Sequence, residues 1–169
     1  VLLIYADNDS AQINLSKEIT LRGIDSSRLI FGKHLSKSEY LARYRVADLF
    51  LDTHPYNAGT TARDALRMGL PVLTSLGSSA VSRHAASVIT ALNLPELIAA
   101  TEEEYESLAI ELATDPEKLK IIKDKLVGNL STAPLYDTPL FARNLESAYS
   151  MMYDRYQRGL DPDHIYVKH

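Results

Sequence analysis

Short apolar runs alternate along the chain with longer segments of helical periodicity. The runs are nearly all apolar, which is typical of strands covered on both faces by helices in a parallel sheet. The expected strands are residues 1–6, 28–32, 49–52, 71–75 and a short 96–99. The segments between them are long enough for right-handed βαβ crossovers. We therefore expect an α/β fold built on a doubly wound parallel sheet of about five strands.

Capping residues and prolines mark the expected helix ends. Ser36 and Glu39 form a capping box that opens a helix reaching about residue 46. Thr60 can cap a helix that runs through residue 68, and Gly69 ends it. Further helices are expected from Ser78 or Ser79 to about 92, after Thr101, after Asp115 with Pro116 at its first position, and over about 140–158.

Composition narrows the function classes. The chain has 169 residues, 46% hydrophobic and 24% charged, so we expect one ordinary globular domain over residues 1–169. The absence of cysteine excludes a disulfide scaffold, an iron–sulfur cluster, a thiol nucleophile and a cysteine zinc site. A chain without cysteine fits a reducing compartment, and we expect a cytoplasmic protein.

Charge and motifs exclude other classes. The net charge is −4, no basic stripe suggests a nucleic-acid partner, and no apolar run approaches the roughly 20 residues that a membrane span needs. No H-E-x-x-H, G-x-G-x-x-G, Walker or G-x-S-x-G motif occurs. The chain opens in a strand without Met, and we expect it to be a segment of something longer.

The loop after the third expected strand carries the richest chemistry. In open α/β sheets, ligands bind beyond the carboxyl ends of the strands. Gly59 lets a ligand approach the backbone, and Thr60 and Thr61 offer hydroxyls and amides at a helix N-terminus, which suits a phosphate. Asp64 lies one turn later and can accept hydrogen bonds from two ribose hydroxyls. Two interpretations stay open: a nucleoside diphosphate site, or a helix cap followed by a solvated acid.

Two other segments add candidates. Lys37, Tyr40 and Arg43 recur every three residues, and a cation, a ring and a guanidinium on one face can hold a base and ribose. Taken alone, this trio is more typical of a solvent-exposed face. The turn at residues 76–79 is expected to form another helix N-terminus. Such a turn could contact a second phosphate or a sugar, but more often it only caps the helix that follows.

Several blocks in order resemble the O-linked N-acetylglucosamine transferase (Spindly-type) family of glycosyltransferases. The resemblance covers nearly the whole chain. It rests on residues 47–53, Asn57, Thr60-Thr61, Asp64, residues 69–74, 82–83, 85–87, 97–99, 104–105, 114–115 and 162–164.

The resemblance implies a GT-B architecture, in which two Rossmann-like domains flank the active site. This chain looks like the C-terminal domain, which holds the nucleotide-sugar donor. By this resemblance, Thr60 and Thr61 match the positions that hold the diphosphate, and Asp64 matches the acid that binds the ribose. Lys37 matches a lysine that contacts the ribose, and Arg43 matches an arginine near the uracil.

Two positions depart from the family pattern. Tyr40 falls where the animal enzymes have a histidine against the base, and Gly59 falls where they have another histidine near the phosphates. The expected donor is UDP-N-acetylglucosamine. The alternatives are GDP-fucose, as in Spindly-type relatives, or a non-catalytic α/β binding domain.

The resemblance also implies the reaction, glycosyl transfer to a Ser or Thr hydroxyl of a protein without a metal or other cofactor. The acceptor-side residues, a phosphate-binding lysine and a tetratricopeptide array are expected upstream of Val1. We therefore expect no catalytic residue in this chain and no turnover by the chain alone.

The last expected helix carries an apolar stripe formed by Leu145, Tyr149, Met152 and Tyr156. The spacing favours packing over a partner surface. In GT-B proteins such a helix often crosses back to the first domain, so the resemblance also implies that part of the stripe is exposed here as an apolar patch.

Overall fold

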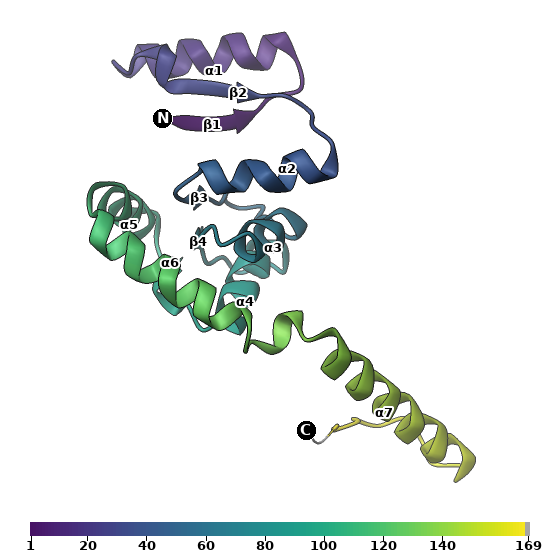
Figure 1. Ribbon diagram of the computed structural model, residues 1–169. Helices are drawn as coiled ribbons and strands as arrows, with labels where there is room; N and C mark the ends of the chain where they lie inside the picture. Colours follow the sequence, from purple (N-terminus) through teal and green to yellow (C-terminus); the bar gives the residue numbers. More distant parts are fainter. Residues whose placement is uncertain (168–169) are drawn as a thin grey trace. The chain divides into compact units, whose positions relative to one another are not determined.

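A computed structural model describes residues 1–167 of the chain. It contains two compact units, Val1–Ala42 and Arg43–His169. In both units parallel strands are joined by helices (Figure 1). All five expected strands are present, somewhat shorter than expected, and every pairing is parallel.

The first unit contains one strand pair. Its elements are β1 (Leu2–Tyr5), α1 (Asp9–Leu21), the 3-10 turn η1 (Ser26–Arg28), β2 (Leu29–Gly32) and most of α2 (Lys37–Arg43). β1 pairs with β2 from Leu2 opposite Leu29 to Tyr5 opposite Gly32. The Asn8 side chain caps α1 by accepting the N–H of Ala11 at 2.8 Å.

The strands of this unit are not covered on both faces, and that expectation is wrong for β1 and β2. Leu29 is buried, but Leu2 is 46% exposed and Ile30 is 49% exposed. Two strands and one helix supply too few side chains to cover both faces of the pair. The apolar runs therefore identified the strands correctly and overstated their burial.

The capping box at the start of α2 is confirmed. The Glu39 carboxylate accepts the N–H of Ser36 at 3.1 Å and its hydroxyl at 2.6 Å. These two bonds favour the charged form, and they lower the pKa of Glu39. The expected helix to about residue 46 is α2 followed by a 3-10 turn.

The second unit contains a three-stranded sheet in the order β3-β4-β5. Its elements are η2 (Tyr44–Val46), β3 (Phe50–Leu51), α3 (Thr60–Arg67), β4 (Val72–Ser75), η3 (Val81–Arg83), α4 (His84–Ala91), η4 (Pro95–Leu97), β5 (Ile98–Ala99), α5 (Glu102–Thr114), α6 (Pro116–Leu130), η5 (Pro134–Tyr136) and α7 (Thr138–Gln157). Phe50 pairs with Val72, and Thr74 with Ile98.

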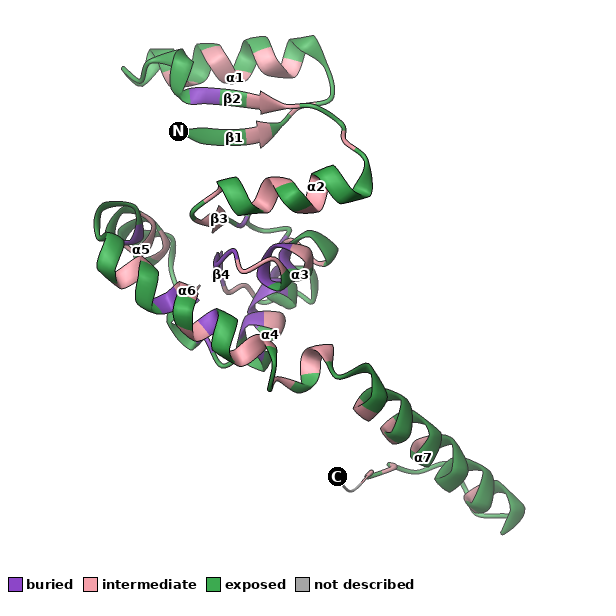
Figure 2. Ribbon diagram, in the orientation of Figure 1, coloured by how far each residue is buried: buried purple, intermediate pink, exposed green. Residues whose placement is uncertain are grey.

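The hydrophobic core surrounds β4, which is buried along its whole length (Figure 2). α3 contributes Ala62, Ala65 and Leu66, whose spacing places them on one face of the helix. α4 adds Ile89, and α6 adds Leu126. Complete burial of one such leucine or isoleucine side chain contributes about 1.5–3 kcal/mol. This packing fixes α3 and α4 against the sheet.

Several expected helix ends are confirmed in the second unit. The Thr101 side chain accepts the N–H of Glu104 at 3.1 Å, and α5 follows. The Asp115 side chain accepts the N–H of Lys118 at 3.0 Å and caps α6. Gly69 follows α3 with φ +80, a backbone conformation that glycine adopts without strain.

The last helix, α7, is longer than expected and lies outside the core. None of its 20 residues is buried, although Asp137 caps it through the N–H of Leu140. The stripe is exposed from Leu145 at 37% to Tyr156 at 76%. The expected apolar patch is confirmed, and the packing interpretation of this stripe is wrong for the chain as described. Across residues 1–167, no helix combines the length and apolarity that a membrane span requires.

Candidate functional site

The candidate site lies beyond the carboxyl ends of β3 and β4, where Asp52 organises the loop. The Asp52 side chain is buried, and its Oδ1 accepts the N–H groups of Thr53 at 2.9 Å and Ala58 at 2.7 Å. Its Oδ2 accepts the hydroxyl of Thr74, on β4, at 2.7 Å. One carboxylate therefore ties both ends of the loop to the central strand.

Burial and hydrogen bonding act in opposite directions on Asp52. Desolvation raises the pKa of this carboxyl, while the bonds from Ala58, Thr74 and Thr53 lower it, and the net effect is a raised pKa. The backbone carbonyl of Asp52 accepts the Tyr105 hydroxyl of α5 at 2.9 Å. Burial and the nearby Asp52 charge raise the pKa of Tyr105 to about 12, so the phenol stays a donor at neutral pH.

Asn57 fixes the middle of the same loop. It is buried, its N–H donates to the Val81 carbonyl at 3.1 Å, and its Nδ2 donates to the Thr53 carbonyl at 2.9 Å. Its Oδ1 has no hydrogen-bond partner within the described part of the chain. The sequence reasoning assigned no role to Asp52 or Asn57. For Asp52, the available sequence signal was its position as a polar residue directly after the apolar run of β3.

The loop ends at the N-terminus of α3. Gly59 occupies the N-cap position and offers no side chain to cap the helix, so Thr60 is the first helical residue. The expectation that Thr60 caps this helix is therefore wrong. Thr60 and Thr61 are exposed, and Asp64 is half-buried one turn later. The first turn and a half of α3 thus brings together four of the predicted residues.

The remaining predicted residues lie on α2. Arg43 ends this helix, and the next residue, Tyr44, donates its hydroxyl to the Thr61 carbonyl at 3.4 Å. That bond places η2 against the first turn of α3. Lys37 and Tyr40 belong to the first unit, where the Lys37 Nζ lies 5.0 Å from the centre of the Tyr40 ring. The nucleotide-binding roles of all seven residues stay predictions.

A histidine of the neighbouring helix reaches the same place. A Cβ added to Gly59 would lie 3.5 Å from Nδ1 of His84, the first residue of α4. The resemblance puts a histidine at position 59, and here an imidazole stands beside that position from another helix.

The turn after β4 is closed on itself, contrary to the expectation of a helix N-terminus at Ser78 or Ser79. The Ser82 hydroxyl accepts the N–H of Ser79 at 3.0 Å, and Gly77 donates its N–H to the Ser82 carbonyl at 2.9 Å. Arg83 donates to the Gly77 carbonyl at 2.9 Å. These bonds satisfy the turn internally, and α4 begins only at His84.

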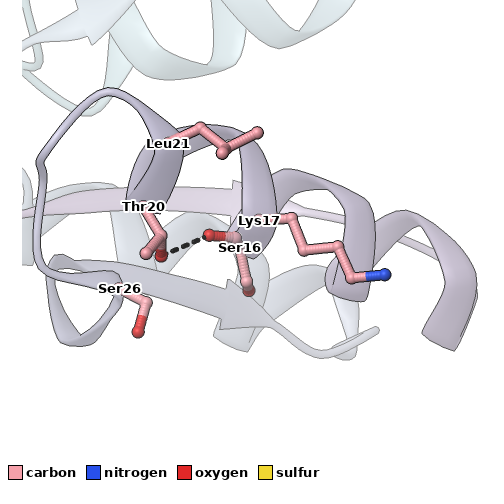
Figure 3. Close-up of a pocket in the computed structure, with 5 residues that line it drawn as sticks. All are labelled: Ser16, Lys17, Thr20, Leu21 and Ser26. Carbon is pink, nitrogen blue, oxygen red and sulfur yellow. Dashed lines mark hydrogen bonds between the residues drawn. The ribbon is translucent and has the colours of Figure 1, made fainter.

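A pocket of about 260 Å³ opens at the carboxyl edge of this sheet. Its lining residues are Asp52, His54, Ser75, Glu102 and Tyr105. A second pocket, of about 400 Å³, lies in the first unit (Figure 3) and is lined by Ser16, Lys17, Thr20, Leu21 and Ser26. Because Ser26 precedes β2, this second pocket lies toward the amino end of the strand and away from the usual ligand edge.

In the described portion, residues 1–167, no three His, Cys, Asp or Glu side chains group closely enough to hold a metal ion.

Comparison with known proteins identifies the family. The family model described as Glycosyl transferase family 41 matches residues 2–145. The chain belongs to this family. It is 36% identical over 152 residues to the UDP-N-acetylglucosamine–peptide N-acetylglucosaminyltransferase of Caenorhabditis elegans, which covers 90% of the chain. It is 38% identical over 124 residues to the probable enzyme SPINDLY of Hordeum vulgare, which covers 73% of the chain.

A solved structure of the family confirms the α/β fold. A mutant of the Thermobaculum terrenum O-GlcNAc transferase superposes with a TM-score of 0.82 at 31% identity, over 94% of this chain and 31% of that one. The chain spans about 13% of the length of the two curated relatives. Family 41 membership therefore describes a glycosyltransferase of which this chain corresponds to one part.

Proposed function

We propose that residues 1–169 form a single domain that binds the nucleotide-sugar donor of a protein O-glycosyltransferase. The donor is UDP-N-acetylglucosamine, and the acceptor is a Ser or Thr hydroxyl of a protein. Membership in family 41 and the activities for which the relatives from Caenorhabditis elegans and Hordeum vulgare are named support this reaction.

The start of α3 carries the proposal. Gly59 leaves the first turn without a side-chain cap, and the turn faces the carboxyl edge of the sheet. Helix N-terminal amides and the positive end of the helix dipole favour a diphosphate there. The exposed Thr60 and Thr61 add two hydroxyls beside those amides.

The ribose and base complete the proposed donor site. Asp64 follows Thr60 by one helical turn, which is the offset of a ribose from its diphosphate. Its carboxylate accepts both ribose hydroxyls. Arg43 and the α2 residues Lys37 and Tyr40 are proposed to contact the ribose and base.

The proposed step is a substitution at the anomeric carbon. The acceptor oxygen bonds to C1 of the sugar as the bond from C1 to the β-phosphate oxygen breaks. The electron pair of that bond goes to the departing diphosphate. Amides already aimed at that position stabilise the growing charge, and no metal or other cofactor is required for this role. The base that takes the hydroxyl proton, and the segments that recruit the protein acceptor, are proposed to lie in the enzyme upstream of this chain.

The lack of cysteine supports placing this enzyme in the cytoplasm. No membrane and no nucleic acid takes part in the proposed reaction. The partners are the donor and the acceptor protein.

Calorimetric titration of the chain with UDP, GDP and UDP-N-acetylglucosamine tests the donor assignment. The unchanged chain should prefer UDP over GDP. Asp64→Ala should weaken UDP binding by about tenfold or more, since a hydrogen bond to a charged group contributes about 1.5–3 kcal/mol. Asp154→Ala, at an exposed acid of α7, is the matched control and should bind UDP normally.

Titration with 2′-deoxy-UDP assigns the ribose contact to Asp64. The unchanged chain should bind this analogue more weakly than UDP, and Asp64→Ala should bind both alike because the acceptor is gone. Preference for GDP would move the donor to GDP-fucose. If Asp64→Ala weakened UDP and 2′-deoxy-UDP equally, so that UDP still bound more tightly than the analogue, the ribose role of Asp64 would be contradicted. Absence of binding by every nucleotide would favour a non-catalytic binding domain.

A further inference from the structure

Hydrogen bonds fix both the main chain and the side chain of Asp52. Its N–H donates to the Leu73 carbonyl of β4 at 2.9 Å, and its own carbonyl accepts the Tyr105 hydroxyl of α5 at 2.9 Å. Its Oδ2 accepts the hydroxyl of Thr74, which is completely buried, at 2.7 Å. Only 5% of Asp52 is exposed. The carboxylate is therefore anchored to the central strand and to α5.

The second carboxylate oxygen of Asp52 closes the loop that follows β3. Oδ1 accepts the N–H of Thr53 at 2.9 Å and the N–H of Ala58 at 2.7 Å, at the two ends of the loop. Asn57 strengthens the closure, because its Nδ2 donates to the Thr53 carbonyl at 2.9 Å. One anchored side chain thus holds the backbone at residue 58.

The bond to Ala58 lies immediately before α3. Gly59 is the cap residue and contributes no side-chain bond, and Thr60 is the first helical residue. The Asp52 carboxylate therefore does at this helix start what a capping side chain does elsewhere, since it fixes the backbone that leads into the first turn.

The rest of α3 is placed by different contacts. Ala62, Ala65 and Leu66 are buried in the core and fix the body of the helix against the sheet. Asp64 is carried by this part of the helix. Its position depends on core packing, whereas the backbone of residues 58–61 depends in addition on Asp52.

We propose that Asp52 is a positioning residue for donor binding, whose carboxylate sets the backbone of residues 58–61 in the arrangement that receives the diphosphate. The proposal rests on the proposed donor function of the α3 N-terminus. Asp52 acts through the loop backbone and touches neither the donor nor the acceptor.

A closed loop raises affinity because it need not be ordered when the ligand binds. The apparent dissociation constant equals the intrinsic constant divided by the fraction of molecules that are already in the binding arrangement. If the loss of the carboxylate leaves the loop closed in about one molecule in ten, UDP binds about tenfold more weakly. Uridine lacks the diphosphate, and its ribose contact, Asp64, is placed by the core.

NMR titration of the chain with UDP and with uridine tests this role. Asp52→Ala should weaken UDP by about tenfold, leave uridine within about twofold and speed hydrogen exchange of the Ala58 amide. Asp52→Asn keeps an oxygen that accepts from Thr53 and Ala58, and its amide nitrogen can donate to the Thr74 hydroxyl. This conservative variant should retain UDP affinity within about threefold of the unchanged chain.

Two further variants separate positioning from folding. Thr74→Val releases the carboxylate from β4 with a side chain of similar shape, and it should weaken UDP by about threefold without affecting uridine. This variant carries the test if Asp52→Ala does not fold. Ile122→Val is the matched control, since it loosens the core at a buried position of α6 and should bind both ligands normally.

Equal UDP affinity in Asp52→Ala and the unchanged chain would overturn the proposal. An equal loss for uridine would also overturn it, because a merely structural role predicts that result. A loss in Asp52→Asn as large as in Asp52→Ala would reject positioning by these hydrogen bonds. Loss of UDP binding in Asp64→Ala, with no effect of Asp52→Ala, would leave the donor function intact and reject Asp52. Absence of binding of UDP and uridine by the unchanged chain would reject the donor function and this role of Asp52 with it.

Discussion

The hydroxyl of Tyr105 donates to the backbone carbonyl of Asp52 across 53 positions of sequence, at 2.9 Å. Asp52 follows β3, and Tyr105 lies in the first turns of α5. The bond joins the loop that carries the candidate site to α5, the helix that follows β5. Its removal should therefore affect the loop without altering the exposed surface of α3.

Tyr105→Phe should lower the free energy of unfolding by about 1–2 kcal/mol, since a half-buried carbonyl loses its donor. Denaturant unfolding of both proteins, followed by circular dichroism, measures this change. Tyr153→Phe, at an exposed tyrosine of α7, is the control and should unfold like the unchanged chain. Equal stability of Tyr105→Phe would mean that water replaces the phenol at no cost.

Asp52 should make stability depend on pH. Because its pKa is raised in the folded protein, the folded state binds a proton at pH values where the unfolded state does not. The contribution is fully present below the unfolded value of 3.8 and is lost as the pH rises through the raised folded pKa. Asp52→Asn cannot titrate, and its amide oxygen can still accept from Thr53 and Ala58.

The free energy of unfolding of the unchanged chain, minus that of Asp52→Asn, should therefore increase as the pH falls from neutrality toward 3.8. Urea unfolding of the two proteins at a series of pH values gives this difference. Its decrease on acidification would mean that hydrogen bonding outweighs burial at Asp52. A flat difference would place its folded and unfolded pKa at the same value.

Local patterns predicted the elements well because strand runs, capping boxes and prolines act within a few residues. The helix starts after Thr101 and Asp115 were predictable for that reason. Contacts between residues far apart in the sequence leave no comparable local pattern from which they could be predicted. Asp52 and Thr74 meet because β3 pairs with β4, and His84 comes close to position 59 because α3 packs against α4.

Burial was the least predictable property. The runs in β1 and β2 are as apolar as those in the core, yet Leu2 and Ile30 remain nearly half exposed. The composition of a strand shows how much apolar side-chain surface it has available for burial. How much of that surface is buried depends on how many other elements pack against the strand. The Thr60 cap failed for a local reason, since Gly59 already occupies the cap position.

The turn after β4 should tolerate no side chain at Gly77. A Cβ there would lie 2.2 Å from the Ser82 hydroxyl oxygen and 2.4 Å from the Ser82 Cβ, so the turn must shift. Gly77→Ala should destabilise the chain by about 1–3 kcal/mol, the usual cost of overpacking. Thermal unfolding measures the change.

Gly128→Ala is the matched control for that substitution. Gly128 lies inside α6, and no atom would lie within 4 Å of an added Cβ. Alanine should stabilise this helix by about 0.5–1 kcal/mol relative to glycine. Equal melting temperatures for Gly77→Ala and the unchanged chain would show that the turn relaxes around Ser82.

UDP binding should not depend on a divalent metal, because the proposed diphosphate contacts are amides and side-chain donors. Dialysis against EDTA should leave the calorimetric affinity for UDP within about twofold, a difference of about 0.4 kcal/mol. Readdition of Mg²⁺ or Mn²⁺ to the same sample is the control. A large loss with EDTA that either metal reverses would contradict metal-independent binding.

The exposed face of α7 should make the isolated chain self-associate. Leu145 and Met152 lie on this face with Tyr149, and no residue of the helix is buried. Apolar surface of this kind is removed from water by association. Sedimentation velocity over a range of concentrations should therefore show a species larger than the monomer.

The double substitution Leu145→Ser and Met152→Ser should reduce that association without unfolding the chain. Because neither side chain belongs to the core cluster, the free energy of unfolding of the monomer should change by less than about 0.5 kcal/mol. Ile122→Ser, at a buried position of α6, is the contrasting variant and should destabilise the fold. A strictly monomeric unchanged chain would show that α7 is covered in solution. A large loss of stability in the double variant would place the same face inside the folded unit.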